Sequence, residues 1–291
     1  MDGVAKRPSR RERRRIAQRR RRRRLLALGG VAVLVIAVVG VLALTGGGGA
    51  PHATRHPKPV ATTTPTTLPA DTGPFAIVTT KVPELPVYPL PTTASPPVVT
   101  LAAETSYGLP TTLLVQSNGT TVHIPPGWLP VLVPLHKPNG TPGYVQLSQV
   151  TETATPYVIE VNLTQHALVV KRSGVPVLDT KVIIGTPSTK TPTGVYSITD
   201  PLNCNAMSVP GYPLAQCSPV YGQAAIGTSG LSNDLNSFDG TIPQIALHGT
   251  NLPDSNLGQD LSNGCVRMPN AAILQILSLQ PLLGTPVFVT A

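Results

Sequence analysis

The chain has 291 residues, a formal net charge of +9 and a sequence pI of about 9.8. Its basic excess is confined to residues 1–24, which contain thirteen Lys and Arg residues and only two acidic residues. That segment carries +11 and the rest of the chain sums to −2. Because everything after residue 24 is close to neutral, the charge gives no support for nucleic-acid binding by a folded part. The length suffices for about two domains plus tails.

Residues 25–45 carry no charge and are nearly all Leu, Val, Ala, Ile and Gly. As a helix, 21 residues at about 1.5 Å each span about 31 Å, the thickness of a bilayer core. We therefore predict a single transmembrane helix in the cell membrane. The preceding cations place residues 1–24 in the cytoplasm and residues 46 onward outside. The alternative is a cleaved signal peptide, whose apolar region is usually shorter.

Residues 46–74 are rich in Gly, Pro and Thr and poor in large apolar side chains, so this composition predicts a disordered linker. Residues 75–150 contain short β-type runs at 76–79, 113–116, 131–133 and 144–147, broken by Pro and Gly. They predict a small all-β module, with Trp128 as a core residue and a ligand platform as the alternative.

From residue 157 the sequence pattern of β-strands becomes more regular. Apolar and polar residues alternate over 157–163, and 167–185 predicts two strands around the Ser173-Gly174 turn. Further strands are expected at 195–198 and 287–289. Apolar residues at 273, 274 and 277 predict one short helix, with Asn270 as its cap. The C-terminal domain is therefore predicted to be mainly β.

The chain has three cysteines. Cys204 and Cys217 are thirteen positions apart, and in an oxidising compartment they are candidates for a disulfide that leaves Cys265 free. No CxxC pair occurs and the six histidines are scattered, so no metal site is predicted.

Cys265 is the candidate nucleophile, since an imidazole can take the proton of a thiol and stabilise the thiolate. The candidate base is His248, which ends the apolar run 245–247 and precedes the cysteine by seventeen residues. Gly264 permits a tight turn, so that the N–H groups of Gly264 and Cys265 can bind an oxyanion. The alternative for Cys265 is a buried small apolar residue.

Five segments resemble the L,D-transpeptidase catalytic domain (YkuD type) in the expected order over residues 155–291: VIEVNLTQHALVV, KTPTGVYSI, IALHGT, LGQDLSNGCVRM and GTPVFV. The resemblance implies a β-sandwich in which Cys265 is the nucleophile, His248 the base and Gly264 an oxyanion-hole amide. It implies attack on a peptidoglycan stem tetrapeptide between the diamino acid and the terminal D-Ala. An amine of a neighbouring stem then resolves the thioester as a 3→3 cross-link, without a cofactor.

The resemblance also implies that Ser262 and Arg267 shape the site. Asn263 departs from the family, many of whose members have His there, which puts rate and substrate positioning in doubt. Gly249 follows the base, and its carbonyl is available to orient the imidazole. Arg267 either binds a stem-peptide carboxylate with its guanidinium or has a structural role, as a partner in an ion pair or as a loop clamp.

Tyr212 and Tyr221 lie in the segment 200–240, which is expected to be irregular and to fold over the site as a lid. They are candidate substrate contacts, with surface packing as the alternative. The module at 75–150 resembles the SH3-like domains that precede wall-modifying enzymes of this family, through its GW and PNG-GY pieces.

Three other functions remain open at this point. Water as the acceptor would make the protein an L,D-carboxypeptidase, and a protein amine would make it an enzyme that attaches proteins to the wall. A non-catalytic wall-binding protein is the third, for which Asn263 is the only indication.

Overall fold

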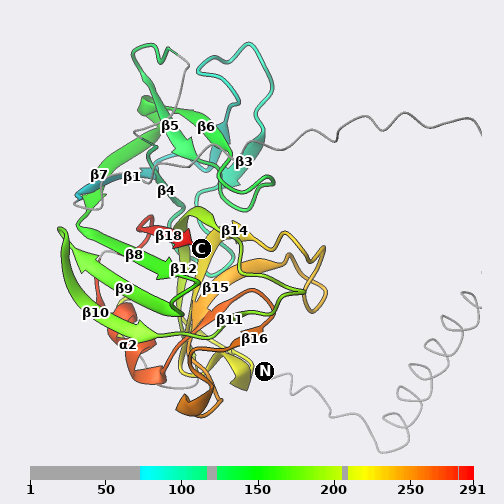
Figure 1. The fold of residues 1–291 in the computed structure, drawn as a ribbon. Helices are drawn as coiled ribbons and strands as arrows, with labels where there is room; N and C mark the ends of the chain where they lie inside the picture. The colour runs from blue at the N-terminus through cyan, green and yellow to red at the C-terminus, as the bar shows by residue number, and fades with distance from the viewer. Residues whose placement is uncertain (1–72, 117–122, 205–208, 281) are drawn as a thin grey trace, which may run out of the picture. The chain divides into compact units, whose positions relative to one another are not determined.

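The computed structural model describes residues 73–116, 123–204, 209–280 and 282–291 (Figure 1). The predicted basic tail, the membrane helix and nearly all of the linker lie outside these residues. In the part that is described, no helix has the length and apolar character to cross a membrane. These residues are mainly β-strand with one short α-helix, α2 (Asn270–Ser278), so the predicted fold class is confirmed there.

The described residues of the N-terminal module form seven strands. They are β1 (Phe75–Thr80), β2 (Glu84–Val87), β3 (Val99–Ala102), β4 (Thr112–Leu114), β5 (Trp128–Leu132), β6 (Pro142–Gln146) and β7 (Val150–Thr155). β1 pairs with β4 and β7 in one antiparallel sheet, while β2–β3 and β5–β6 form two-stranded sheets. Trp128 is only half-buried and packs edge-to-face on Tyr88, with ring centroids 5.5 Å apart, so its predicted place in the core is wrong. The SH3-like character stays a prediction.

The module is joined to the C-terminal domain by hydrogen bonds as well as by the chain. Asn139 donates from Nδ2 to the Leu231 carbonyl at 2.7 Å, and its Oδ1 accepts the Leu231 N–H at 2.9 Å. The Leu135 N–H donates to the Ser229 carbonyl at 2.8 Å. Both contacts are made by β14 (Ala224–Leu231). This strand of the C-terminal domain is therefore where the module is bound.

The C-terminal domain begins at β8, one residue after β7 ends. Its other strands are β9 (Ala167–Arg172), β10 (Val175–Lys181), β11 (Ile184–Gly185), β12 (Gly194–Cys204), β13 (Leu214–Ala215), β14, β15 (Gln244–His248), β16 (Asp260–Ser262), β17 (Val266–Arg267) and β18 (Pro286–Thr290), with β8 spanning Tyr157–Asn162. The hydrogen-bonded order is β10-β9-β8-β18-β12-β14-β15-β17, and β13 pairs with β12.

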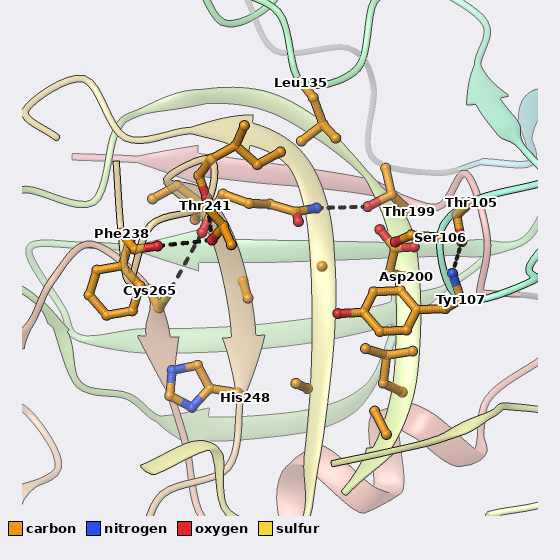
Figure 2. A pocket seen from close by; sticks show the side chains of 18 of the residues that line it. Thr105, Ser106, Tyr107, Leu135, Thr199, Asp200, Phe238, Thr241, His248 and Cys265 are labelled. Carbon is orange, nitrogen blue, oxygen red and sulfur yellow. Dashed lines mark hydrogen bonds between the residues drawn. The ribbon is translucent and has the colours of Figure 1, made fainter. Parts of the chain in front are cut away.

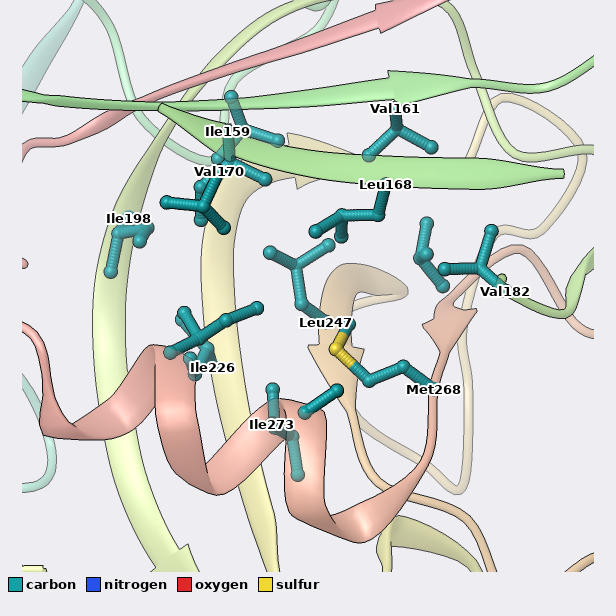
Figure 3. Close-up of a cluster of buried hydrophobic side chains, with 14 of the residues drawn as sticks. Ile159, Val161, Leu168, Val170, Val182, Ile198, Ile226, Leu247, Met268 and Ile273 are labelled. Carbon is teal, nitrogen blue, oxygen red and sulfur yellow. The ribbon is translucent and has the colours of Figure 1, made fainter. Parts of the chain in front are cut away.

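β12 connects the two halves of this sheet. Its first four residues pair with β18 and the following ones with β14. The apolar side chains of β8 and β9 thereby face those of β14, β15 and α2 across one core, as Figure 3 shows for Ile159, Leu168, Ile226, Leu247 and Ile273. The alternation predicted over 157–163 puts Ile159 and Val161 into this core.

The helix α2 buries one face, with Ala272, Ile273, Ile276 and Leu277 directed into the core. Asn270 does not cap it, because the N-cap position is Pro269. Instead, Asn270 accepts the Gln223 N–H on Oδ1 and donates from Nδ2 to the Thr250 carbonyl. The side chain therefore ties together the loops before β14 and after β15.

The segment 200–240 is less irregular than its sequence predicts. It contains the end of β12, then β13, a 3₁₀ turn (Pro219–Tyr221) and all of β14, whose eight residues are buried. The strand was missed because AAIGTSGL lacks both alternation and large β-branched residues. A central strand buried on both faces does not need alternation.

Candidate active site

Cys265 sits in a tight turn between β16 and β17. Gly264 has a φ of +110°, a conformation that side chains with a Cβ rarely adopt. The buried Ser262 hydroxyl donates to the Cys265 carbonyl at 2.6 Å and accepts the Gly264 N–H at 3.1 Å. The Gly264 amide that was predicted for an oxyanion hole is thus already engaged by a hydroxyl two residues earlier, and it is not free in this conformation.

The pairing of β15 and β17 brings His248 and Cys265 to one face. The two strands are parallel, with Leu247 beside Val266 and His248 beside Arg267. Leu247 and Val266 both lie in the core, so His248, Cys265 and Arg267 point to the opposite face. One step back in this register, Cys265 lies beside Ala246, diagonal to His248. Both side chains line the same cavity (Figure 2).

His248 is 2 % exposed, and its Nδ1 lies 2.6 Å from the Gly249 carbonyl oxygen. A carbonyl can only accept, so Nδ1 carries the proton and Nε2 is left as the acceptor. Burial lowers the pKa of His248 to about 4, with the nearby Arg267 charge acting in the same direction and the Gly249 hydrogen bond opposing it. The imidazole is therefore neutral at pH 7, and Gly249 orients it as the sequence predicted.

Cys265 is a half-buried free thiol whose Sγ lies 3.9 Å from the Gln244 carbonyl oxygen. Burial raises its pKa, while a hydrogen bond from the Ala246 N–H and the charge of Arg267 lower it. Because burial disfavours both the thiolate and the imidazolium, the resting pair is a neutral thiol and a neutral imidazole. Such a pair can transfer its proton as the sulfur attacks.

Arg267 lines the cavity next to this pair. Its Nε is buried and has no hydrogen-bond partner, and no ion pair involves its side chain among the residues that are described. The predicted ion pair therefore has no partner among the described residues, whereas a bound carboxylate would satisfy the guanidinium.

The cavity has a volume of about 770 Å³. Its lining comes from β12, β14, β15, the loops at 215–221 and 235–243, and residues 101–107 and 134–135 of the N-terminal module, as Figure 2 shows for Tyr107 and Leu135. Asn263 and Tyr221 are part of this lining. Tyr221 also packs edge-to-face on the His248 ring, with centroids 4.8 Å apart.

Other predicted contacts do not reach the cavity. Tyr212 packs against the domain core, and its hydroxyl donates weakly to the Leu279 carbonyl at 3.4 Å. Ser262 and Gly249 act through the turn and the imidazole instead of lining the wall. Sequence reasoning missed Asp200, a buried carboxylate of β12 that lines the cavity. Its only signal was that it is the one charged residue of β12.

The structure joins Cys204 to Cys217 by a disulfide, with Cα atoms 5.3 Å apart. This bridge links the end of β12 to the loop that lines the cavity at 215–221. Cys265 takes part in no disulfide.

Residues 156–289 match the family model YkuD, described as the L,D-transpeptidase catalytic domain. The C-terminal domain is similar to the YkuD family over these residues. The resemblance predicted from the sequence is confirmed over these residues, and none of the curated proteins matches the chain.

Several solved structures are similar, two of them L,D-transpeptidases. A mutant of the Enterococcus faecium enzyme is 23% identical over 46% of this chain and 50% of its own, with a TM-score of 0.34. A Mycobacterium tuberculosis H37Rv L,D-transpeptidase is 16% identical over 62% and 90%, with a TM-score of 0.38. Bd1075 of Bdellovibrio bacteriovorus is 28% identical over 47% and 48%, with a TM-score of 0.33. The chain thus spans about half the length of the first and third proteins.

Proposed function

We propose that this protein is a peptidoglycan L,D-transpeptidase that forms 3→3 cross-links through a thioester on Cys265. The YkuD domain supports the enzyme class. The observation that carries the mechanism is the placement of a free thiol on the same sheet face as His248, whose tautomer is fixed by Gly249.

In the proposed acylation step, Nε2 of His248 accepts the thiol proton while Sγ attacks the carbonyl between the diamino acid and the terminal D-Ala. The N–H of Cys265 is the candidate donor to the oxyanion, since that of Gly264 is engaged by Ser262. The imidazolium returns its proton to the D-Ala amine, which leaves, and the thioester remains. An amine from a neighbouring stem then attacks the thioester, forms the cross-link and regenerates the thiol.

The lining supplies substrate contacts in this proposal. Arg267 takes a stem-peptide carboxylate close to the thiol, and the Asn263 amide donates and accepts hydrogen bonds at the rim. Tyr221 holds the imidazole from the side and contacts substrate through the part that faces the cavity.

We also propose that residues 25–45 anchor the protein in the membrane and that the domain acts on the wall side. The linker 46–74 would hold it about 30 Å from the bilayer as a coil, or up to about 90 Å as extended polyproline. The mature N-terminus, determined on protein from membrane fractions, tests this: a terminus near residue 50 would indicate secretion.

Incubation with a carbapenem, followed by mass spectrometry of the intact protein, tests the acyl-enzyme. The expected result is an adduct of the mass of the drug on the wild type and none on Cys265→Ala. No adduct at a demonstrably free thiol would instead favour a non-catalytic wall-binding protein.

The acceptor needs a second measurement, because the acyl-enzyme half is shared. Muropeptides digested with and without the enzyme should gain 3→3 dimers. Accumulation of tripeptides alone would show that water is the acceptor and would make the protein an L,D-carboxypeptidase. Muropeptides bearing a protein would show attachment to the wall.

A further inference from the structure

Four residues form one row across the sheet. Asp200 of β12 pairs with Gly227 of β14, and Gly227 pairs with Ala246 of β15. The β15–β17 register then places Cys265 beside Ala246. Neighbouring strands are about 4.8 Å apart, so the Cα atoms of Asp200 and Cys265 are about 14 Å apart.

The two middle residues of this row are small, and the Gln244 amide and the Asp200 carboxylate border the space over Gly227. Gly227 has no side chain, and a Cβ there would lie 2.9 Å from Nε2 of Gln244 and 3.3 Å from Oδ2 of Asp200. Ala246 contributes only a methyl group. All four residues of the row line the cavity. They make a trough with a thiol at one end and a carboxylate at the other (Figure 2).

A β-bulge turns the carboxylate into the trough. Ile198 points into the core, and strict alternation would send residue 200 to the same side. The register shifts between Ile198 and Asp200, so that two residues of β12 oppose one step of β14. Bulges near active sites re-aim side chains in this way. The carboxylate is therefore exposed to the cavity by a specific departure from regular pairing.

Asp200 is only 8 % exposed, and its Oδ1 is buried without a hydrogen-bond partner. A carboxylate in such a place is unfavourable unless a donor or a cation satisfies it. Of the other charged side chains in the lining, Glu104 is an exposed carboxylate of the N-terminal module, and Arg267 lies at the thiol end. The Asp200 end is thus anionic, and Figure 2 shows Tyr107 of the module beside it.

We propose that Asp200 binds a primary ammonium group of the acyl donor. The Cα atoms of Asp200 and Cys265 are about 14 Å apart, and Asp200 Oδ2 leans toward Gly227, so the thiol and the carboxylate are closer than their Cα atoms and a donor amine several bonds from the carbonyl fits between them. Six bonds of extended chain span about 7 Å. This inference rests on the proposed function, under which the side-chain amine of the diamino acid is such a group. Asp200 is then a specificity determinant for a donor whose side-chain amine is free.

The test compares Asp200→Asn, which removes only the charge, with Asp200→Glu and with Asp179→Asn, the same change at an exposed site on β10. Two donor tetrapeptides are used, one with a free side-chain amine and one with that amine acetylated. The wild type and Asp179→Asn should prefer the free amine by roughly ten- to hundredfold in KM, the usual range for a charged hydrogen bond. Asp200→Asn should lose this preference, and Asp200→Glu should keep part of it.

Asp200→Asn should also be at least as resistant to heat as the wild type, because it removes an unpaired buried charge; a purely structural carboxylate would give the opposite result. Unchanged discrimination between the two peptides in Asp200→Asn would overturn the inference.

Binding measured by calorimetry in the Cys265→Ala protein separates this inference from the proposed function. If the wild type transfers neither peptide, yet Cys265→Ala binds the free-amine peptide more tightly in an Asp200-dependent manner, the proposed function fails and the ammonium site stands. If affinity does not depend on Asp200, the ammonium site is wrong even if transfer is observed.

Discussion

Replacing His248 by Gln should remove a specific part of the pH dependence of folding. The pKa of His248 is about 4 in the folded protein and 6.5 when unperturbed. Between these values the unfolded chain binds a proton that the folded one does not, so stability rises with pH through this window and is fully present above 6.5. At about 1.36 kcal/mol per pH unit, acidification from pH 7 to pH 4 costs the wild type about 3 kcal/mol through this group.

His248→Gln keeps a side-chain N–H for the Gly249 carbonyl but does not titrate. The free energy of unfolding of the full chain is measured by urea titration at several pH values for both proteins, followed by circular dichroism, because Trp128 reports only on the N-terminal module. Other acidic groups and histidines titrate in both proteins and cancel in the difference. The difference between the two proteins should shrink by about 3 kcal/mol from pH 7 to pH 4.

Parallel curves for the two proteins would refute the reasoning, since they would mean that the imidazole is not held neutral by burial. The same pKa predicts that carbapenem acylation of Cys265 stays nearly constant from pH 7 to pH 5 and falls only as pH approaches 4. An acid limb near pH 6.5 would contradict it.

Three further variants test the turn, the bridge and the cation. Ser262→Ala should lower stability by about 1–3 kcal/mol in urea titrations and slow acylation, because the Gly264 N–H loses its acceptor; unchanged acylation would show that the turn holds without the hydroxyl. Replacing both Cys204 and Cys217 by Ser should lower the free energy of unfolding, measured by calorimetry, by about 3 kcal/mol. An unchanged free energy of unfolding would mean that the disulfide does not stabilise the fold. Arg267→Gln should raise KM for a tetrapeptide roughly tenfold or more, whereas an equal effect on a donor lacking the terminal carboxylate would exclude the carboxylate contact.

The elements that were predictable are those whose pattern is local. Alternation over 157–163 gives β8, and the Ser173-Gly174 turn, with both residues at positive φ, gives the β9–β10 hairpin. His248 was expected at the end of a strand because the apolar run stops there, and β15 does end at that residue.

The features that were missed depend on register, which a single sequence does not encode. Asp200 reaches the cavity only because a bulge reverses the phase of β12, and β14 shows no alternation because all eight of its residues are buried in the folded protein. The engagement of the Gly264 amide depends on a hydroxyl two residues away in a turn whose conformation the sequence left open.

The contribution of residues 101–107 and 134–135 to the cavity has a practical consequence for anyone who prepares the YkuD domain alone. A fragment that begins at residue 156 would keep the thiol, the imidazole and the carboxylate, yet water would enter where Tyr107 and Leu135 now stand. Its reactivity toward small acylating drugs would look normal while its choice among peptides deteriorated. Measurements of selectivity therefore need protein that starts before β1.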